Sequence, residues 1–162
     1  MTDIRTLGIL AGAGALPALL VAACQQQGIA PFIIAFEGQT DPALVQGRQH
    51  LWTRLGAAGQ ILETLRAHDV RDVVMIGAIR RPSLTELRPD LTAAGFFARL
   101  GFRALGDDGL LGALKIFLQE QGFAVHGVQR FVQGLLARPG VLGRVKPHAD
   151  DSDDIRRGFA VA

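Results

Sequence analysis

Two glycines near the start of the chain have a spacing that suits the binding of a phosphate. Gly12 and Gly14 follow the apolar run 6–11 and precede a segment with helical periodicity. Glycine lets a backbone approach a ligand closely, and the free N–H groups in the first turn of a helix point toward an anion. The pattern Gly12-x-Gly14-x-x-Pro17 matches the dinucleotide fingerprint, except that Pro17 replaces its third glycine. The loop therefore predicts a nucleotide or sugar-phosphate site, with a plain strand-to-helix turn as the alternative.

The same stretch has some features of a bacterial lipoprotein signal, because Arg5 and an apolar run precede Cys24. Against that interpretation, the basic region is a single arginine offset by Asp3, and Pro17 interrupts the apolar run. Helical periodicity accounts for the same residues, since the apolar positions are Leu16, Leu19, Leu20, Ala23 and Cys24. We therefore interpret the segment as an amphipathic helix in which Cys24 is a small buried residue.

A second candidate site follows the apolar run 72–76, which has the composition of a buried strand. It begins at Gly77 and carries the adjacent cations Arg80 and Arg81. Ligands of open α/β sheets bind at the carboxyl ends of the strands, where an arginine pair can clamp a phosphate. The alternative is a solvated loop with two surface cations. Glu37 ends another apolar run, at a position where a ribose-binding acid would be expected.

The acidic pair Asp107 and Asp108 opens a segment with helical periodicity. Carboxylates at such a position cap the helix and are favoured by its dipole. The functional alternative is a ligand to Mg²⁺, a hard ion that prefers carboxylate oxygens. We interpret the acidic cluster 150–154 as a solvated linker, and the four histidines of the chain show no metal-ligand spacing. Capping is the simpler interpretation of the pair, and the metal ligands stay unknown.

Composition narrows the class of protein. A chain of 162 residues with 49% hydrophobic content can form one ordinary domain with a sizeable core. The formal net charge of +2 is too small to imply nucleic-acid binding, and the aromatic residues lack interleaved basic ones. The single cysteine excludes a disulfide framework, which fits a reducing cytosol.

The elements that must position these residues alternate between strand and helix patterns. Apolar runs predict strands at 6–11, 32–36, 51–55, 72–76 and 123–127. Helical periodicity predicts helices at 15–27, at 58–68, at 91–102, from Asp107 onward, and around Phe131, Val132 and Leu135. This alternation is typical of a parallel sheet with helices on both faces. We therefore expect an α/β fold, a Rossmann-like three-layer sandwich with a mainly parallel sheet.

The segment 88–103 mixes apolar residues with the cations Arg88, Arg99 and Arg103. It could lie at a membrane surface or cover acyl chains. The alternative is a helix that packs in the core or against another domain.

The end of the chain differs from the rest. Periodicity is lost after Pro139, and a short helix pattern begins near Asp153. A helix of about two turns is marginal on its own. We expect a Rossmann-like domain over residues 1–146, followed over 147–162 by a linker and the start of a helix that lead to a second domain absent from this chain.

Taken in order, the motifs at 8–17, 77–84, 87–90 and 106–108 resemble those of the LpxI-type UDP-2,3-diacylglucosamine pyrophosphatases. The tail from Arg144 to Gly158 is similar to the junction between the two domains of that family. The resemblance covers essentially the whole chain, but only the first domain of a family member. It implies that Gly12, Gly14, the turn 77–82, Asp107 and Asp108 lie on the ligand side.

The resemblance implies a cytoplasmic bacterial hydrolase of lipid A biosynthesis that could contact the inner membrane. Such enzymes use a divalent metal, here expected to be Mg²⁺, to hydrolyse UDP-2,3-diacylglucosamine to UMP and 2,3-diacylglucosamine 1-phosphate. Their catalytic carboxylate belongs to the second domain, so we assign no catalytic residue here and expect the isolated chain to be inactive. The alternatives are a non-catalytic nucleotide-binding module, a fragment of a nicotinamide-dependent oxidoreductase, and a purely structural partner domain.

Overall fold

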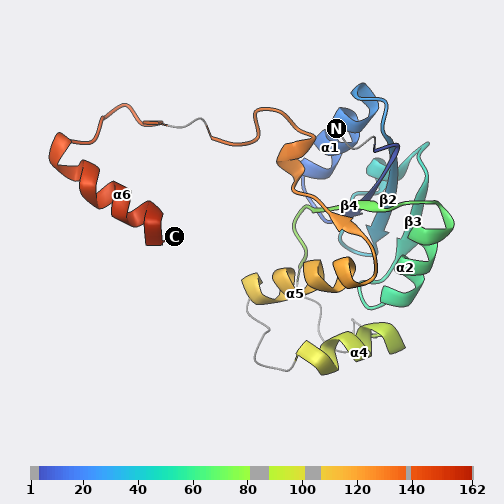
Figure 1. Ribbon diagram of the computed structural model, residues 1–162. Helices are drawn as coiled ribbons and strands as arrows, with labels where there is room; N and C mark the ends of the chain where they lie inside the picture. Colours follow the sequence, from blue (N-terminus) through green and yellow to red (C-terminus); the bar gives the residue numbers. More distant parts are fainter. Residues whose placement is uncertain (1–3, 81–87, 101–106, 138–139, 162) are drawn as a thin grey trace.

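A five-stranded parallel sheet forms the centre of the computed structural model, which describes residues 4–80, 88–100, 107–137 and 140–161 (Figure 1). The strands are β1 (Thr6–Ala11), β2 (Ala30–Phe36), β3 (His50–Thr53), β4 (Asp72–Ile76) and β5 (Ala124–Val125). They lie in the order β3-β2-β1-β4-β5, and each neighbouring pair is parallel. The order reverses between β1 and β4, so the carboxyl ends of these two strands form a topological switch point.

The central strand β1 is apolar on both of its faces. Ile9 packs into the core on one side of the sheet, and Leu10 packs into the core on the other. The register places Ala11 beside Ala35 of β2 and Ile76 of β4. Because these strands run in the same direction and end at nearly the same level, the loops that follow them leave from one edge of the sheet.

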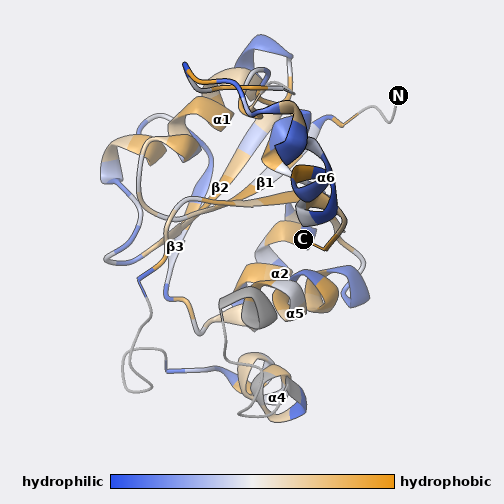
Figure 2. Ribbon diagram, turned by 90° about the vertical axis from the view of Figure 1, so that its left-hand side faces the viewer, coloured by the Kyte–Doolittle hydropathy of each residue, from blue (hydrophilic) through white to orange (hydrophobic). Residues whose placement is uncertain are grey.

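Helices cover both faces of this sheet (Figures 1 and 2). On one face, α1 (Leu16–Gln26) buries Leu20, Val21 and Cys24. On the other face lie α2 (Ala58–Ala67) and α5 (Asp107–Glu120), whose buried residues belong to the second core cluster. A further helix, α4 (Leu91–Leu100), lies beyond α2 and α5 and away from the sheet (Figure 2). The expected α/β sandwich with helical layers on both sides of a parallel sheet is confirmed.

The expected helix around Phe131, Val132 and Leu135 was wrong. The chain forms only a 3₁₀ turn there, η3 (Val128–Arg130). Gly134 has φ +76°, in the left-handed region, which a right-handed helix does not use. Phe131 is nevertheless buried in the same core as α1, and its carbonyl oxygen accepts a hydrogen bond of 2.7 Å from Gln27 Nε2. The apolar residues of this segment therefore predicted the burial of Phe131 correctly and the backbone conformation incorrectly.

The edge strand β5 is shorter than the expected 123–127, and side chains hold it to β4. His126 Nε2 lies 2.6 Å from Asp72 Oδ1, and Arg130 Nη1 lies 3.0 Å from His126 Nδ1. An arginine can only donate, so Nδ1 accepts and the Nε2–H group donates to Asp72. These contacts give His126 a structural role at the sheet edge.

The helix expected near Asp153 is present as α6 (Ser152–Val161). All of its side chains are exposed, including Ile155 and Phe159, and Figure 1 shows it away from the sheet. The proposed division between residues 146 and 147 stays a prediction. Within the described ranges, no helix combines the length and apolar character that crossing a membrane requires.

Burial of Cys24 generates a test of the α1 packing. Desolvation raises the pKa of the thiol to about 11 from its ordinary value of 9.0. The unfolded chain therefore loses this proton first as pH rises, and the stability that the neutral thiol contributes should fall between about pH 9 and 11. We expect urea unfolding to show this loss for the wild-type chain but not for Cys24→Ala.

This pH window is favourable because the chain has no tyrosine and only two lysines that would titrate in it. The native thiol should also react with a disulfide reagent at pH 8 only as fast as the domain opens. Rapid labelling of Cys24 without denaturant would contradict the buried position of this residue.

Candidate functional site

The loops that follow β1 and β4 cross at the carboxyl edge of the sheet. Gly12 N donates to the carbonyl oxygen of Ile76 at 2.8 Å, which extends the parallel ladder by one bond. The chain then forms an antiparallel bridge in which Ala13 N donates to Ala78 O at 2.7 Å and Ala78 N donates to Ala13 O at 3.0 Å. The two glycine motifs found in the sequence are therefore joined, backbone to backbone, at the topological switch point.

This crossing explains why both positions are glycine. A Cβ atom on Gly12 would lie 2.4 Å from the carbonyl oxygen of Ala78. A Cβ atom on Gly77 would lie 2.8 Å from Ala13 O, and Gly77 also has φ +94°. Any side chain at these two positions would push the two loops apart. Gly12 and Gly77 therefore have a structural function, whatever ligand the edge binds.

The crossing also determines which backbone donors remain for a ligand. The N–H groups of Gly12 and Ala13 are already bonded to the β4 side. By contrast, the N–H groups of Gly14, Ala15 and Leu16 have no hydrogen-bond acceptor among the described residues. Gly14 is exposed and has φ +98°, and Ala15 and Leu16 beside it at the start of α1 are exposed as well. An anion at this edge would therefore meet the loop at Gly14 and beyond.

Two residues after β2, Gln39 and Thr40, stabilise this arrangement with side-chain hydrogen bonds. Neither was identified as a candidate from the sequence. Thr40 is 5% exposed; its Oγ1 donates to Ala11 O at 2.5 Å and accepts from Phe36 N at 2.8 Å. The side chain of Gln39 reaches the β4 loop, where Oε1 accepts from Arg80 N at 2.8 Å and Nε2 donates to Arg80 O at 3.4 Å. Their place directly after a predicted buried strand was the available signal.

A pocket of about 210 Å³ opens beside the glycine loop, between α1 and the 3₁₀ turn η1 (Pro42–Val45). Gly12 and Gly14 line one side, and Asp41 and Arg48 bring the charged groups. Arg48 Nη1 donates to Leu44 O at 2.9 Å, while its Nε is buried without a partner in the described part of the chain. The pocket therefore has a cationic side chain in its lining, and sequence reasoning did not identify it.

Comparisons with known proteins decide the family. The model of the LpxI N-terminal domain matches residues 6–135. The chain therefore belongs to the LpxI N-terminal domain family. It is 30% identical over 162 residues to the UDP-2,3-diacylglucosamine pyrophosphatase LpxI of Caulobacter vibrioides. That match covers 98% of this chain and 57% of the relative, so the chain spans less than two thirds of the relative's length.

Solved structures that resemble this LpxI N-terminal domain are distant. A UDP-glucose 4-epimerase from Stenotrophomonas maltophila with bound NAD and formylated UDP-arabinopyranose has a TM-score of 0.47 and 14% identity, covering 98% of this chain and 48% of its own. The enzyme WbmH of Bordetella bronchiseptica in complex with NAD⁺ also has a TM-score of 0.47, with 7% identity and coverage of 76% and 55%. Neither likeness bears on what this LpxI domain binds.

The remaining predicted site residues, two arginines and two aspartates, do not all lie at the edge where the loops cross. Arg80 is exposed and its backbone is held by Gln39, while Arg81 lies outside the described residues. Asp107 and Asp108 begin α5, on the face of the sheet opposite α1, and their side chains are outside the description. The structure therefore joins Gly12, Gly14, Gly77 and Arg80 at one edge and leaves the role of the acidic pair a prediction.

The described residues of this LpxI domain do not form a metal site. No group of three His, Cys, Asp or Glu side chains comes together among them. Asp72 is bonded to His126 at the sheet edge, and Asp41 accepts from Ala43 N at 2.9 Å. The carboxylates of Asp72 and Asp41 therefore make hydrogen bonds that stabilise the fold.

The close approach of the two loops predicts how one added methyl group, at Gly12, changes the stability of the domain. Gly12→Ala places a Cβ against a backbone oxygen that cannot rotate away, so we expect a loss of about 3 kcal/mol in the free energy of unfolding. The matched control is Gly112→Ala in α5, where a Cβ meets nothing within 4 Å and should add up to about 1 kcal/mol. Urea unfolding measures both, and a Gly12→Ala variant as stable as wild type would contradict the crossing.

Proposed function

We propose that this chain is the binding domain of a UDP-2,3-diacylglucosamine pyrophosphatase in lipid A biosynthesis. In the reaction, water adds to one phosphorus of the diphosphate, the bridging P–O bond breaks, and the products are UMP and 2,3-diacylglucosamine 1-phosphate. One observation carries the proposal. The family match over residues 6–135 contains both of the loops that cross at the carboxyl edge, where open α/β sheets bind ligands.

The proposed task of this chain is to bind and orient the substrate. The free N–H groups of the turn from Gly14 to Leu16 suit a phosphate oxygen, and the exposed Arg80 belongs to the loop after β4 at the same edge. Arg81 and the pair Asp107 and Asp108 remain ligand-side candidates by family resemblance alone. We assign no catalytic residue to the chain, because the family resemblance places the catalytic carboxylate in the second domain.

We propose that Mg²⁺ serves the whole enzyme by offsetting charge on the diphosphate. The described residues do not fit such an ion, since they offer no cluster of three ligating side chains. We propose that the domain expected to follow this chain supplies the catalytic carboxylate. Because the substrate is a lipid, we also propose that the whole enzyme works in the cytoplasm at the inner membrane.

The sequence of the glycine loop weakens the nicotinamide alternative. In the dinucleotide fingerprint the third glycine permits close packing of the helix on the strand, and the pyrophosphate lies at the helix N-terminus. Pro17 replaces that third glycine here. The N–H groups of Gly12 and Ala13 are bonded to Ile76 and Ala78, so any anion at this edge, a pyrophosphate included, would meet the loop at Gly14 and beyond.

An exchange of domains tests the proposal. The first part of the Caulobacter vibrioides relative is replaced by this chain, and UMP release from UDP-2,3-diacylglucosamine is measured with and without Mg²⁺. We expect the chimera to release UMP and the 162-residue chain alone to release none, since the family resemblance places the catalytic carboxylate in the second domain. A chimera that folds but leaves the substrate intact would contradict the proposed function, and turnover by the isolated chain would contradict the assignment of catalysis elsewhere.

A further inference from the structure

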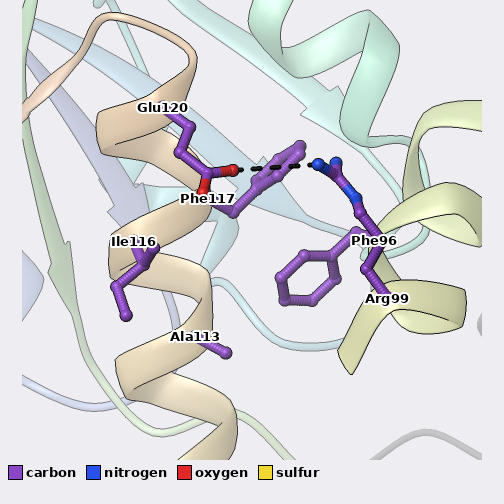
Figure 3. A pocket seen from close by; sticks show the side chains of 6 residues that line it. All are labelled: Phe96, Arg99, Ala113, Ile116, Phe117 and Glu120. Atoms are coloured by element: carbon purple, nitrogen blue, oxygen red, sulfur yellow. Dashed lines mark ion pairs between the residues drawn. The ribbon is translucent and has the colours of Figure 1, made fainter. Parts of the chain in front are cut away.

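A groove of about 190 Å³ lies between α4 and α5, far from the glycine loops in the sequence (Figure 3). Its lining is mostly hydrocarbon, and its residues are Phe96, Arg99, Ala113, Ile116, Phe117 and Glu120. The helix α4 belongs to the segment whose mixture of apolar and basic residues suggested either acyl-chain contact or ordinary packing. The fold leaves this groove open, although the residues beneath it are packed.

The floor of the groove is buried and its wall is exposed. Phe117 is 4% exposed and packs on Phe96 with ring centroids 5.0 Å apart, which ties α4 to α5. On the same face of α5, Ile116 is 57% exposed, and Ala113 is too small to fill the space beside it. Apolar surface of this kind favours an apolar occupant over water.

The polar groups of the groove lie on one side of it. Arg99 Nη1 lies 3.9 Å from Glu120 Oε2, and both side chains are more than half exposed, so this ion pair is weak. Among the described residues, Arg99 Nε also donates to Gly95 O at 3.4 Å. A guanidinium has five N–H donors, so Arg99 can keep Glu120 and still donate to a neutral carbonyl oxygen.

We propose that the α4–α5 groove binds one acyl chain of the lipid substrate, with the acyl carbonyl oxygen accepting a hydrogen bond from Arg99. This proposal rests on the proposed function, which supplies a substrate with two acyl chains. The uncharged carbonyl suits a mouth that holds one cation and one anion, and the hydrocarbon suits Phe96, Ala113 and Ile116. The groove would then set the preference of the enzyme for acyl-chain length.

The size of the groove limits how much of the chain it holds. An apolar cavity of about 150 Å³ accepts benzene, so a groove of this size should hold about seven or eight carbons, with the rest of a longer chain outside. Each methylene that enters the groove should tighten binding about two- to fourfold, and methylenes beyond the groove should add little. Affinity should therefore rise with chain length and then level off at about eight carbons.

The test uses uncharged acyl-N-methylglucamides, each with an amide carbonyl and one chain of four, six, eight or ten carbons, below their micelle concentrations. They are titrated into the 162-residue chain while the ¹³C methyl signals of Ala113 and Ile116 are followed by NMR. Signals from Val21 and Leu44, which line the pocket beside the glycine loop, serve as an internal control. We expect the largest shifts at Ala113 and Ile116, with the dependence on chain length given above.

Two matched variants separate groove binding from adhesion to the surface. Ala113→Trp fills the groove and should weaken binding of the eight-carbon probe at least tenfold. Ala98→Trp adds the same side chain on an exposed part of α4 outside the lining and should leave binding within about twofold. Equal effects of the two variants, shifts located elsewhere, or an affinity independent of chain length would each overturn the proposal. So would binding to phospholipid vesicles that Ala113→Trp leaves unchanged, which would indicate a membrane-facing surface.

The failure of this proposal is distinguishable from that of the proposed function. UMP release by the chimera without acyl binding in the groove would overturn the groove assignment and leave the pyrophosphatase function standing. Acyl binding in the groove by a chain whose chimera releases no UMP would support the acyl site and remove the substrate named for it.

Discussion

The backbone crossing between the loops after β1 and β4 is the constraint on which the candidate site depends. Two peptide groups exchange hydrogen bonds at Ala13 and Ala78, and the approach is so close that neither Gly12 nor Gly77 can carry a Cβ. Backbone bonds of this kind hold the two halves of the sheet together at the switch point. They also occupy the N–H groups of Gly12 and Ala13, so the donors that remain for an anion at this edge begin at Gly14.

The surroundings of the crossing divide the molecule into two regions with different chemistry. On the α1 side, polar groups from the loop after β2 hold the edge, and a pocket with Asp41 and Arg48 lies next to the glycine turn. On the α5 side, the outer helix α4 and α5 form an apolar groove. The proposed substrate has a polar diphosphate and long hydrocarbon chains, and we propose that the two regions receive these two parts.

Much of the fold could be predicted from the sequence because buried parallel strands are continuous apolar runs. The strands at 6–11 and 72–76 were predicted at their observed bounds, and the sheet class followed from their alternation with helices. The apolar residues around Phe131 were predicted as a helix because periodicity reports burial, whereas Gly134 decides the backbone conformation. The glycine loops were identified one at a time. Three features were not predicted: the crossing of these loops, the hydrogen bonds between Gln39 and Arg80, and the pocket at Arg48. They depend on contacts between residues far apart in the sequence, which spacing along a chain does not encode.

The central claim is that this edge presents ligand donors from Gly14 onward, because Gly12 and Ala13 are occupied by the crossing. An ¹H–¹⁵N NMR titration of the chain with 2,3-diacylglucosamine 1-phosphate, with NADH as the comparison ligand, tests it most directly. The account predicts that the amide signals of Gly14, Ala15 and Leu16 shift with the lipid product, that those of Gly12 and Ala13 move little, and that NADH has no comparable effect. Largest shifts at Gly12 and Ala13, or tighter binding of NADH than of the lipid product, would contradict it.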